Sequence, residues 1–310
     1  MEAPQRVFVT GGSGFVGTNV LERLVADDIQ VSTLARDGNV SVDSPLVSVT
    51  KGGLFDADAL RGAMDGCDAV IHLVGIIFEK PGDGVTFERI HVEGTRAVLE
   101  AMAATGVKRL VHMSALGARP DAVSKYHRTK FAAEELVRQS DVSWTIFRPS
   151  MIHGPRGDFM RQAAGWARGK AVPFIFMPYF GKGVTGFGGS GRIQPVYVKD
   201  VASAFVEAVG NPKAFGRVYN LCGPDVMTWP QMHHVISKTV RGRKKAAVPV
   251  PAWYAKLLAK VAPAGVLPFN LAQVQMSQED NVGDTTEFLA DFDITPAAFE
   301  PTVASYADQL

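Results

Sequence analysis

The chain has 310 residues, of which 46% are hydrophobic and 20% are charged, and its formal net charge is +1. This composition supplies enough apolar material for a sizeable core and excludes wholesale disorder. The nearly balanced charge argues against a globally basic protein that binds nucleic acid. We therefore expect a globular protein with one large α/β domain and an appendage, or with two domains.

Cysteine and histidine usage indicates a reduced compartment and no metal site. Cys67 and Cys222 are far apart and fit no ligand spacing, and the seven histidines do not cluster. The first residues lead directly into a strand and a glycine turn, and no apolar stretch approaches the roughly 20 residues that a bilayer span needs. We predict a cytoplasmic protein that is neither secreted nor membrane-spanning.

Through the first half of the chain, short β-branched runs alternate with longer amphipathic segments. The predicted strands are residues 6–10, 30–35, 46–51, 69–75, 108–114 and 143–149. The predicted helices are residues 19–28, 56–66, 86–106, with Gly106 as a C-cap, and 127–140. This alternation predicts an α/β fold with a doubly wound parallel Rossmann sheet and helices on both faces.

After Pro149 the regular alternation ends. We predict a Rossmann core over residues 1–150 and a small, mostly helical substrate lobe over 151–310, with 193–210 returning to the core as a strand and a helix. Residues 181–192 are glycine-rich and predict a flexible loop. No internal repeat is present.

Charge is unevenly spread near the end of the chain. Residues 226–278 contain seven basic residues and no Asp or Glu, whereas residues 279–310 contain eight acidic residues and no Lys or Arg. One interpretation is that the acidic tail packs across the basic segment, or that both are solvated faces. The other is an anionic partner of the basic segment: a phosphate-bearing substrate, a lipid surface or another subunit.

The segment from Thr10 to Gly17 is the strongest motif in the chain. Glycines at 11, 14 and 17 lie between a predicted strand and a predicted helix. The first glycine allows a tight turn, the second a close approach of backbone N–H groups to a pyrophosphate, and the third close packing of helix on strand. This spacing predicts a dinucleotide-binding turn.

The end of the second predicted strand bears on the choice of nicotinamide cofactor. NAD sites usually place an acidic side chain there for the ribose 2′-hydroxyl, and here Ala35 occupies that position. Arg36 could pair with a 2′-phosphate and stack on the adenine, which favours NADP. Asp37 keeps NAD as the alternative.

Tyr126 and Lys130 are four residues apart at the start of a predicted helix, so both project from one face. A neighbouring ammonium and an oxidised nicotinamide would both stabilise a phenolate and lower the pKa of the tyrosine from its ordinary value near 10. This pair is a candidate for proton transfer. Taken alone, however, its spacing is common at exposed helix starts.

Together with the glycine turn, this pair resembles the short-chain dehydrogenase/reductase superfamily in its extended or atypical branch, the NAD-dependent epimerase/dehydratase-like proteins. The resemblance covers almost the whole chain. Within the superfamily, the chain is most similar to the family of the accessory complex I alpha subcomplex subunit nine and its bacterial relatives. The segments that carry the resemblance are His72–Gly75, Phe87–His91, Val92–Thr95, Val111–Ala118, Arg148–Ser150, His153–Pro155, Gln194–Ala202, Asp280–Val282 and Ile294–Tyr306.

The resemblance implies a role for each matching position. It places Gly11, Gly14, Phe15, Val16 and Gly17 at the pyrophosphate, Arg36 at the 2′-phosphate, Leu54 near the adenine, Val74 and Gly75 at the middle of the cofactor, and Tyr126, Lys130 and Pro149 around the nicotinamide ribose. It also implies Tyr126, Lys130 and Ser114 as catalytic residues, and substrate contacts from Phe159 and Gln194.

Three departures from the family pattern predict weakened catalysis. Ala115 occupies the position of the usual Ser or Thr, His91 that of a common Asn, and Gly53 that of an acidic adenine contact. The main functional hypothesis is an NADPH-dependent oxidoreductase of unknown small-molecule substrate. The alternatives are a non-catalytic, cofactor-binding accessory or assembly subunit related to respiratory complex I, and a nucleotide-sugar epimerase or dehydratase in which Arg192 would hold a diphosphate. For the accessory subunit, the basic 226–278 segment would contact a respiratory complex or the inner face of a membrane.

Overall fold

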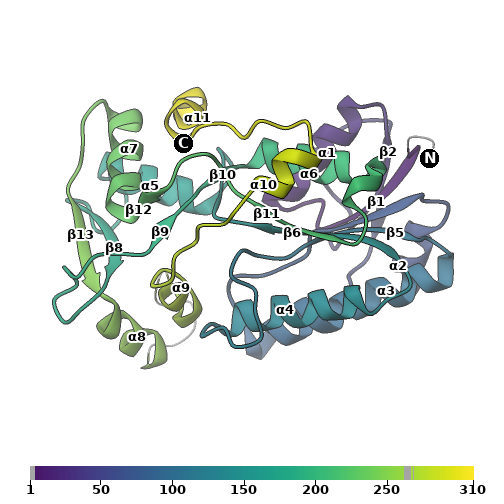
Figure 1. Cartoon of the computed structure of the whole chain (residues 1–310), viewed down its shortest axis with the longest axis horizontal. Coiled ribbons are helices and arrows are strands. Elements are labelled where there is room, and N and C mark those ends of the chain that lie inside the picture. The colour runs from purple at the N-terminus through teal and green to yellow at the C-terminus, as the bar shows by residue number, and fades with distance from the viewer. Residues whose placement is uncertain (1–3, 262–266, 268) are drawn as a thin grey trace. The chain divides into compact units, whose positions relative to one another are not determined.

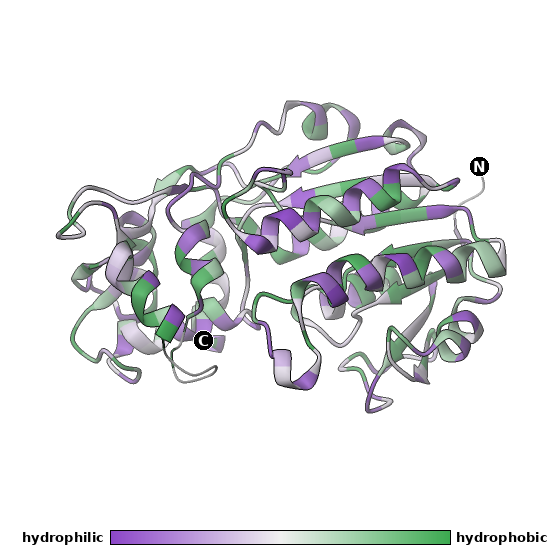
Figure 2. Ribbon diagram, turned by 90° about the horizontal axis from the view of Figure 1, so that it is seen from below, coloured by the Kyte–Doolittle hydropathy of each residue, from purple (hydrophilic) through white to green (hydrophobic). Residues whose placement is uncertain are grey.

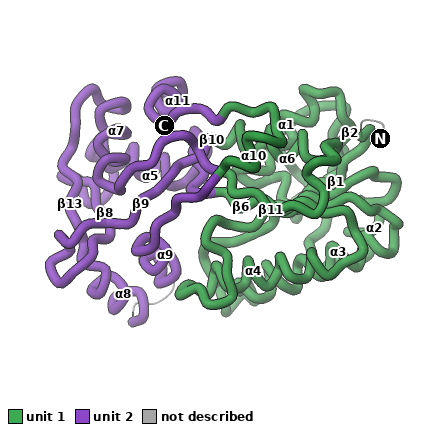
Figure 3. The backbone as a smooth tube through the Cα atoms, viewed as in Figure 1, with its two compact units in different colours: residues 1–149, 198–221, 285–295 green, residues 150–197, 222–284, 296–310 purple. Residues whose placement is uncertain are grey.

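The computed structural model describes residues 4–261, 267 and 269–310, which form two compact units (Figures 1 and 3). Unit 1 contains the described residues of 1–149, 198–221 and 285–295. Unit 2 contains those of 150–197, 222–284 and 296–310. The chain thus leaves unit 1 after Pro149 and returns to it twice.

Unit 1 is built on a seven-stranded parallel sheet with the order β11-β6-β5-β4-β1-β2-β3. Its strands are β1 (Arg6–Thr10), β2 (Gln30–Ala35), β3 (Val47–Lys51), β4 (Ala69–His72), β5 (Arg109–Met113), β6 (Ser143–Pro149) and β11 (Arg217–Leu221). Its α-helices are α1 (Phe15–Ala26), α2 (Ala57–Met64), α3 (Gly94–Thr105), α4 (Lys125–Arg138), α6 (Val198–Gly210) and α10 (Thr286–Asp291). Helices α1 and α6 cover one face, and α2, α3 and α4 cover the other (Figure 1). The predicted doubly wound Rossmann sheet is confirmed.

The sheet forms because its central strands are apolar on both sides. Phe8, Val70 and Leu110 are fully buried and belong to a core cluster that also includes Leu60 and Met102 from α2 and α3. Helices α2 and α3 bury apolar residues in this cluster, and Figure 2 shows hydrophobic and hydrophilic residues interspersed along the helices. A sheet that helices cover on both faces needs strands with nearly continuous apolar residues, and the sequence shows such runs in these strands.

Three elements differ from the sequence prediction. Helix α1 already begins at Phe15, because the glycine turn leads directly into it. The predicted helix over 86–106 starts with a π-helical segment, Glu88–Glu93, and continues as α3, which ends at Gly106 in the left-handed region as expected. Strand β11 was not predicted, because it follows no regular strand and helix alternation and is recruited by long-range pairing with β6.

In the described part of unit 2, helices contain more residues than strands, which form three small two-stranded sheets. Its helices are α5 (Asp158–Arg168), α7 (Trp229–Arg241), α8 (Ala252–Val261), α9 (Leu271–Met276) and α11 (Phe299–Tyr306). The strand pairs are β7 (Ile152–His153) with β10 (Val196–Tyr197), β8 (Met177–Gly181) with β13 (Ala247–Pro251), and β9 (Arg192–Ile193) with β12 (Met227–Thr228). Residues from α5, α7 and α11, including Met160, Met232 and Phe299, form its main core.

Short 3-10 helical turns complete the fold at Pro81–Asp83, Pro212–Ala214 and Ala307–Gln309. The glycine-rich segment after β8 forms a turn that backbone hydrogen bonds close, from Lys182 N to Gly189 O (2.8 Å) and from Gly188 N to Lys182 O (2.9 Å). None of the helices in the described part of the chain combines the length and the apolar character that crossing a bilayer requires.

Candidate cofactor and active site

The residues predicted to hold the cofactor follow strands that end at one edge of the unit 1 sheet. In register, Thr10 at the end of β1 lies beside His72 at the end of β4, and His72 lies beside His112 of β5. The strand order reverses between β1 and β4: β2 and β3 follow on one side, and β5, β6 and β11 follow on the other. In open α/β sheets such a switch point forms the ligand crevice. The fold therefore brings together the glycine turn, the end of β2, the loop after β4 and the ends of β5 and β6.

The turn between β1 and α1 is shaped for an anion. Gly11 has a φ of +77°, and Gly14 N donates to Gly11 O over 3.0 Å. A Cβ atom at Gly17 would lie 2.0 Å from Gly11 O, so only glycine allows this close packing. No side chain caps the helix at Gly14, and its first turn contains no acidic residue, so the first N–H groups, starting at Phe15 and Val16, remain available for a pyrophosphate.

Thr10 and His72 fix this turn against the loop after β4. Thr10 Oγ1 lies 2.6 Å from His72 Nδ1 and accepts a hydrogen bond from Leu73 N. His72 Nε2 lies 3.2 Å from Thr95 Oγ1, so both ring nitrogens have partners. Burial lowers the pKa of His72 to about 3, which keeps the ring neutral at pH 7. A Cβ at Gly11 would lie 3.3 Å from Val74 N, which places this predicted residue directly against the turn.

Arg36 and Leu54, the predicted contacts of the adenosine part of the cofactor, follow the ends of β2 and β3. Arg36 directly follows β2, is exposed, and forms no ion pair within the described ranges. The neighbouring Asp37 instead turns back on its own loop, where its Oδ1 accepts from Asn39 N (3.1 Å). Leu54 is partly buried and packs at the start of α3, where a Cβ at Gly94 would lie 2.4 Å from Leu54 Cδ2.

Lys130 lies beneath the loop after β4. Its side chain is buried, and Nζ donates to Met113 O at the end of β5 over 3.0 Å. A Cβ at Gly75 would lie 2.9 Å from Nζ, so glycine at 75 leaves room for the ammonium group. Burial lowers the pKa of Lys130 to about 8, and Glu134 opposes this shift in part. At pH 7 Lys130 therefore still carries its charge at the point where the sequence predicts a ribose.

Tyr126 is enclosed by aromatic rings. Its ring centroid lies 5.4 Å from that of His91 and 5.8 Å from that of Phe87, both edge-to-face, and 5.3 Å from that of His127. Burial raises the pKa of Tyr126 to about 12, whereas the sequence analysis expected Lys130 and a bound cofactor to lower it. In the protein by itself desolvation dominates, and Tyr126 carries its proton at neutral pH.

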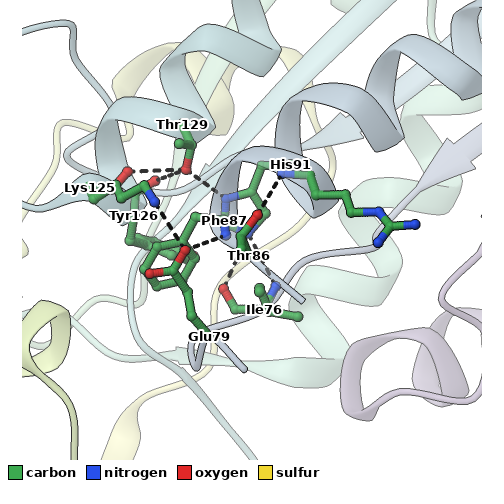
Figure 4. A network of polar contacts seen from close by, with 9 residues as sticks. Ile76, Glu79, Thr86, Phe87, His91, Lys125, Tyr126 and Thr129 are labelled. Carbon is green, nitrogen blue, oxygen red and sulfur yellow. Dashed lines mark hydrogen bonds and ion pairs between the residues drawn. The ribbon is translucent and has the colours of Figure 1, made fainter. Parts of the chain in front are cut away.

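A polar network that the sequence analysis did not identify holds the start of α4 (Figure 4). His91 Nδ1 lies 2.9 Å from Thr129 Oγ1, and His91 Nε2 lies 3.2 Å from both the N and the O atom of Ile76. Burial and the nearby Lys130 lower the pKa of His91 to about 2. His91, at the predicted Asn position, thus links the π-helical segment, the loop after β4 and α4.

Glu79 extends this network from the same loop. Its Oε1 accepts from Phe87 N (2.8 Å) and from Lys125 Nζ (3.2 Å), one residue before Tyr126 (Figure 4). No sequence pattern joins these positions, because the contacts depend on the π-helical segment and on the path of the loop. The sequence showed only the four-residue spacing of Tyr126 and Lys130 on the helix that this network holds.

Ser114 and Pro149 lie at the ends of β5 and β6. The Ser114 amide donates to Phe147 O (2.7 Å), while its buried Oγ has no hydrogen-bond partner among the described residues. Pro149 is buried, and its carbonyl accepts from Leu116 N (2.9 Å). Ala115 is buried and contributes no hydroxyl. The catalytic and cofactor roles of all these residues remain predictions.

The expected substrate contacts belong to unit 2. Gln194 is buried, and its amide donates to Gly223 O and accepts from Gly283 N. Phe159 packs against Trp229 and His233. Across the residues that the structure covers, no group of three or more His, Cys, Asp or Glu side chains could hold a metal ion.

The sheet order, the helices on both faces and the glycine turn define a Rossmann-type dinucleotide-binding protein. The chain belongs to the NAD dependent epimerase/dehydratase family, whose sequence profile matches residues 7–222. This result confirms the resemblance to extended short-chain dehydrogenases/reductases.

Individual relatives include both a subunit of a respiratory complex and a reductase. The chain is 28% identical over 290 residues to subunit 9 of the alpha subcomplex of mitochondrial NADH dehydrogenase (ubiquinone) 1 from Arabidopsis thaliana, covering 90% of this chain and 69% of that protein. It is 31% identical over 280 residues to the (4-alkanoyl-5-oxo-2,5-dihydrofuran-3-yl)methyl phosphate reductase of Streptomyces griseus, covering 89% and 88%. In fold it is similar to the UDP-glucose 4-epimerase of Thermus thermophilus solved with NAD, with a TM-score of 0.74, 20% identity and 98% coverage of both chains.

Proposed function

We propose that this protein is an NADPH-dependent oxidoreductase that reduces a carbonyl group of a small-molecule substrate. The observation that carries the proposal is the arrangement of Lys130 and Tyr126. Lys130 is buried against the end of β5 and the loop after β4, one helical turn from a protonated tyrosine. A relative that is a reductase and matches most of both chains supports the same reaction class.

In the proposed reduction, Tyr126 is the proton donor. Burial raises its pKa to about 12, so the phenol carries the proton that the product alcohol needs. A bound nicotinamide cofactor would supply the hydride. Tyr126 would deliver the proton to the developing alkoxide oxygen, and the charge of Lys130 would stabilise the phenolate left behind. Ser114, next to Ala115, is the candidate hydroxyl for a hydrogen bond to the same oxygen, and its buried Oγ has no other partner among the described residues.

The choice of NADPH over NADH rests on Arg36. Its guanidinium is exposed at the end of β2, whereas the carboxylate of Asp37 is engaged by Asn39 N. A cation without an ion pair at this position complements a 2′-phosphate. NAD is the alternative, supported by the cofactor in the Thermus epimerase structure.

A second candidate function is a non-catalytic accessory subunit that retains a cofactor for stability. Ala115 at the usual hydroxyl position and the similarity to a complex I subunit favour it. In this case the proposed location is the cytoplasm at the inner face of a membrane, with the basic segment 226–278 as the contact region. Residues 262–266 and 268 of that segment lie outside the described residues. The epimerase alternative stays open: Arg192, its proposed diphosphate contact, is paired with Asp280 through its backbone and guanidinium (2.6–2.9 Å), and both side chains are exposed.

Transfer of deuteride from NADPH labelled at C4 tests the main proposal. The protein would be incubated with a panel of aldehydes, ketones and enones, and the deuterated products identified by mass spectrometry. Tyr126→Phe keeps the aromatic contacts but removes the phenolic proton, so transfer should fall about 10²- to 10⁴-fold while NADPH binding is unchanged.

Equal transfer by the wild type and by Tyr126→Phe would contradict the proposed mechanism. Tight NADPH binding by the wild type without transfer to any carbonyl would instead support the accessory subunit.

A further inference from the structure

Helix α8 presents its large apolar side chains outward. Trp253, Leu257 and Val261 are spaced four residues apart on one face and are 55%, 51% and 70% exposed, and Tyr254 beside them is 45% exposed. The small residues Ala252 and Ala255 instead form the buried face, against Val274, Phe180 and Phe269. This reverses the usual pattern of a surface helix, whose polar face is toward solvent.

The glycine-rich turn after β8 adds two further apolar side chains next to this helix. Trp253 Nε1 donates to Val184 O over 2.8 Å, which joins α8 to the turn. Val184 and Phe187 at the tip of the turn are 81% and 76% exposed. The turn is closed at its base and packs on β13, where a Cβ at Gly186 would lie 3.1 Å from Pro249 Cβ. We name Val184, Phe187, Trp253, Tyr254, Leu257 and Val261 the α8 surface; Figure 1 shows α8 beside β13.

Two lysines give the α8 surface a positive edge. Lys256 and Lys260 are one turn apart at one edge of the exposed face and form no ion pair among the described residues. Lys182 lies at the base of the turn, near Asp280. Asp280 is itself held by Arg192, and residues 226–278 contain no Asp or Glu. An exposed apolar face with aromatic rings and flanking lysines complements a layer that is apolar inside and anionic at its surface.

We propose that the α8 surface docks the protein on a bilayer that contains anionic phospholipid. Leu257, Val261, Val184 and Phe187 insert among the acyl chains near the headgroups, and Trp253 and Tyr254 lie at the interface. Lys256 and Lys260 contact the lipid phosphates. Within the basic segment 226–278 this proposal selects the short helix α8, and it adds the turn after β8, which lies outside that segment. It does not depend on the catalytic proposal.

Sedimentation of the full chain with vesicles tests the proposal. Vesicles of phosphatidylcholine with 30% phosphatidylglycerol should bind the protein at least 10-fold more tightly than vesicles of phosphatidylcholine alone. Replacing both Leu257→Glu and Phe187→Glu should reduce binding at least 10-fold. Replacing both Lys256→Gln and Lys260→Gln should reduce binding to the anionic vesicles about 30-fold and weaken its dependence on salt.

Leu289→Glu is the matched control, because Leu289 on α10 is also 51% exposed but belongs to unit 1. Its binding to vesicles should equal that of the wild type, and all variants should keep wild-type NADPH affinity and thermal stability. The proposal is overturned if the wild type does not bind anionic vesicles or if Leu289→Glu weakens binding as much as Leu257→Glu. It is also overturned if sedimentation shows a dimer that Leu257→Glu dissociates, since a second copy would then cover the surface.

Discussion

Single residues at the cofactor edge are placed by steric fit and by solvation. Gly17 is required because a Cβ atom would collide with the backbone at Gly11 O, whereas glycine at 75 leaves room for Lys130 Nζ in its present position. Burial shifts the pKa values of Lys130 and Tyr126 in opposite directions, and both remain protonated at pH 7. The proposed role of Arg36 can be tested separately from catalysis and folding. Its side chain is exposed, and its role concerns only the 2′-phosphate of the cofactor.

Arg36→Ala should weaken NADPH binding about 10- to 100-fold, the loss expected for a hydrogen-bonded charged partner, and should leave NADH binding unchanged. Dissociation constants from nucleotide fluorescence titrations measure both. Arg61→Ala provides the control, since Arg61 is exposed on α2, pairs with Asp58, and should affect neither nucleotide. Equal weakening of both nucleotides, or of neither, would show that Arg36 does not read the 2′-phosphate.

At the scale of elements, a buried ion-pair cluster joins α4 to β6. Glu134 is fully buried and accepts from Arg148 Nε (2.7 Å) and a second Arg148 nitrogen (2.6 Å), and Arg138 donates to it over 2.7 Å. This cluster fixes the helix that carries Tyr126 and Lys130. The next residue, Glu135, also pairs with Arg138 but is 42% exposed. Comparing Glu134 with Glu135 therefore separates the stability that the buried cluster contributes from that of a surface ion pair.

Glu134→Ala should lower the free energy of unfolding by about 3 kcal/mol, because it leaves Arg148 largely buried without its partner. Glu135→Ala should lower it by less than about 1 kcal/mol. Urea denaturation followed by circular dichroism gives both values. Similar losses for the two variants would mean that the buried pair contributes no more than a surface pair.

For the whole molecule, the buried histidines predict sensitivity to acid. Burial lowers the pKa of His72 and His153 to about 3, of His91 to about 2 and of His233 to about 4, and it holds that of His112 well below 6.5. In the unfolded chain each would titrate near 6.5, so the unfolded state binds more protons below that pH. The stability they contribute is complete above about pH 6.5 and is lost as the pH falls toward the folded values.

Below about pH 5.5, each such histidine should cost about 1.4 kcal/mol per pH unit, and five together should unfold a protein of ordinary stability near pH 5. Urea midpoints measured from pH 7.5 to 5.0 would show this slope. His112→Leu, which removes one titrating ring of similar size, should make the slope shallower by about 1.4 kcal/mol per pH unit. Stability that stays constant down to pH 5 and falls only where carboxylates protonate would contradict the prediction.

The sequence by itself determined the parts of this protein that depend on local patterns. Alternating apolar periods predicted six of the unit 1 strands and the helices between them, and the spacing of Gly11, Gly14 and Gly17 predicted the anion-binding turn. These features were readable because backbone sterics and local burial act over a few residues.

Only the tertiary structure decided what depends on long-range contact and on solvation. Pairing with β6 recruited β11, and the π-helical segment brought His91 within hydrogen-bond distance of Thr129 and Ile76. Burial raised the pKa of Tyr126 in the protein by itself, and its lowering by a bound oxidised cofactor and Lys130 stays a prediction. The tertiary structure also decided that the apolar face of α8 points outward. Periodicity in a sequence indicates that a helix has an apolar face, but it does not show which face of the helix the rest of the chain covers.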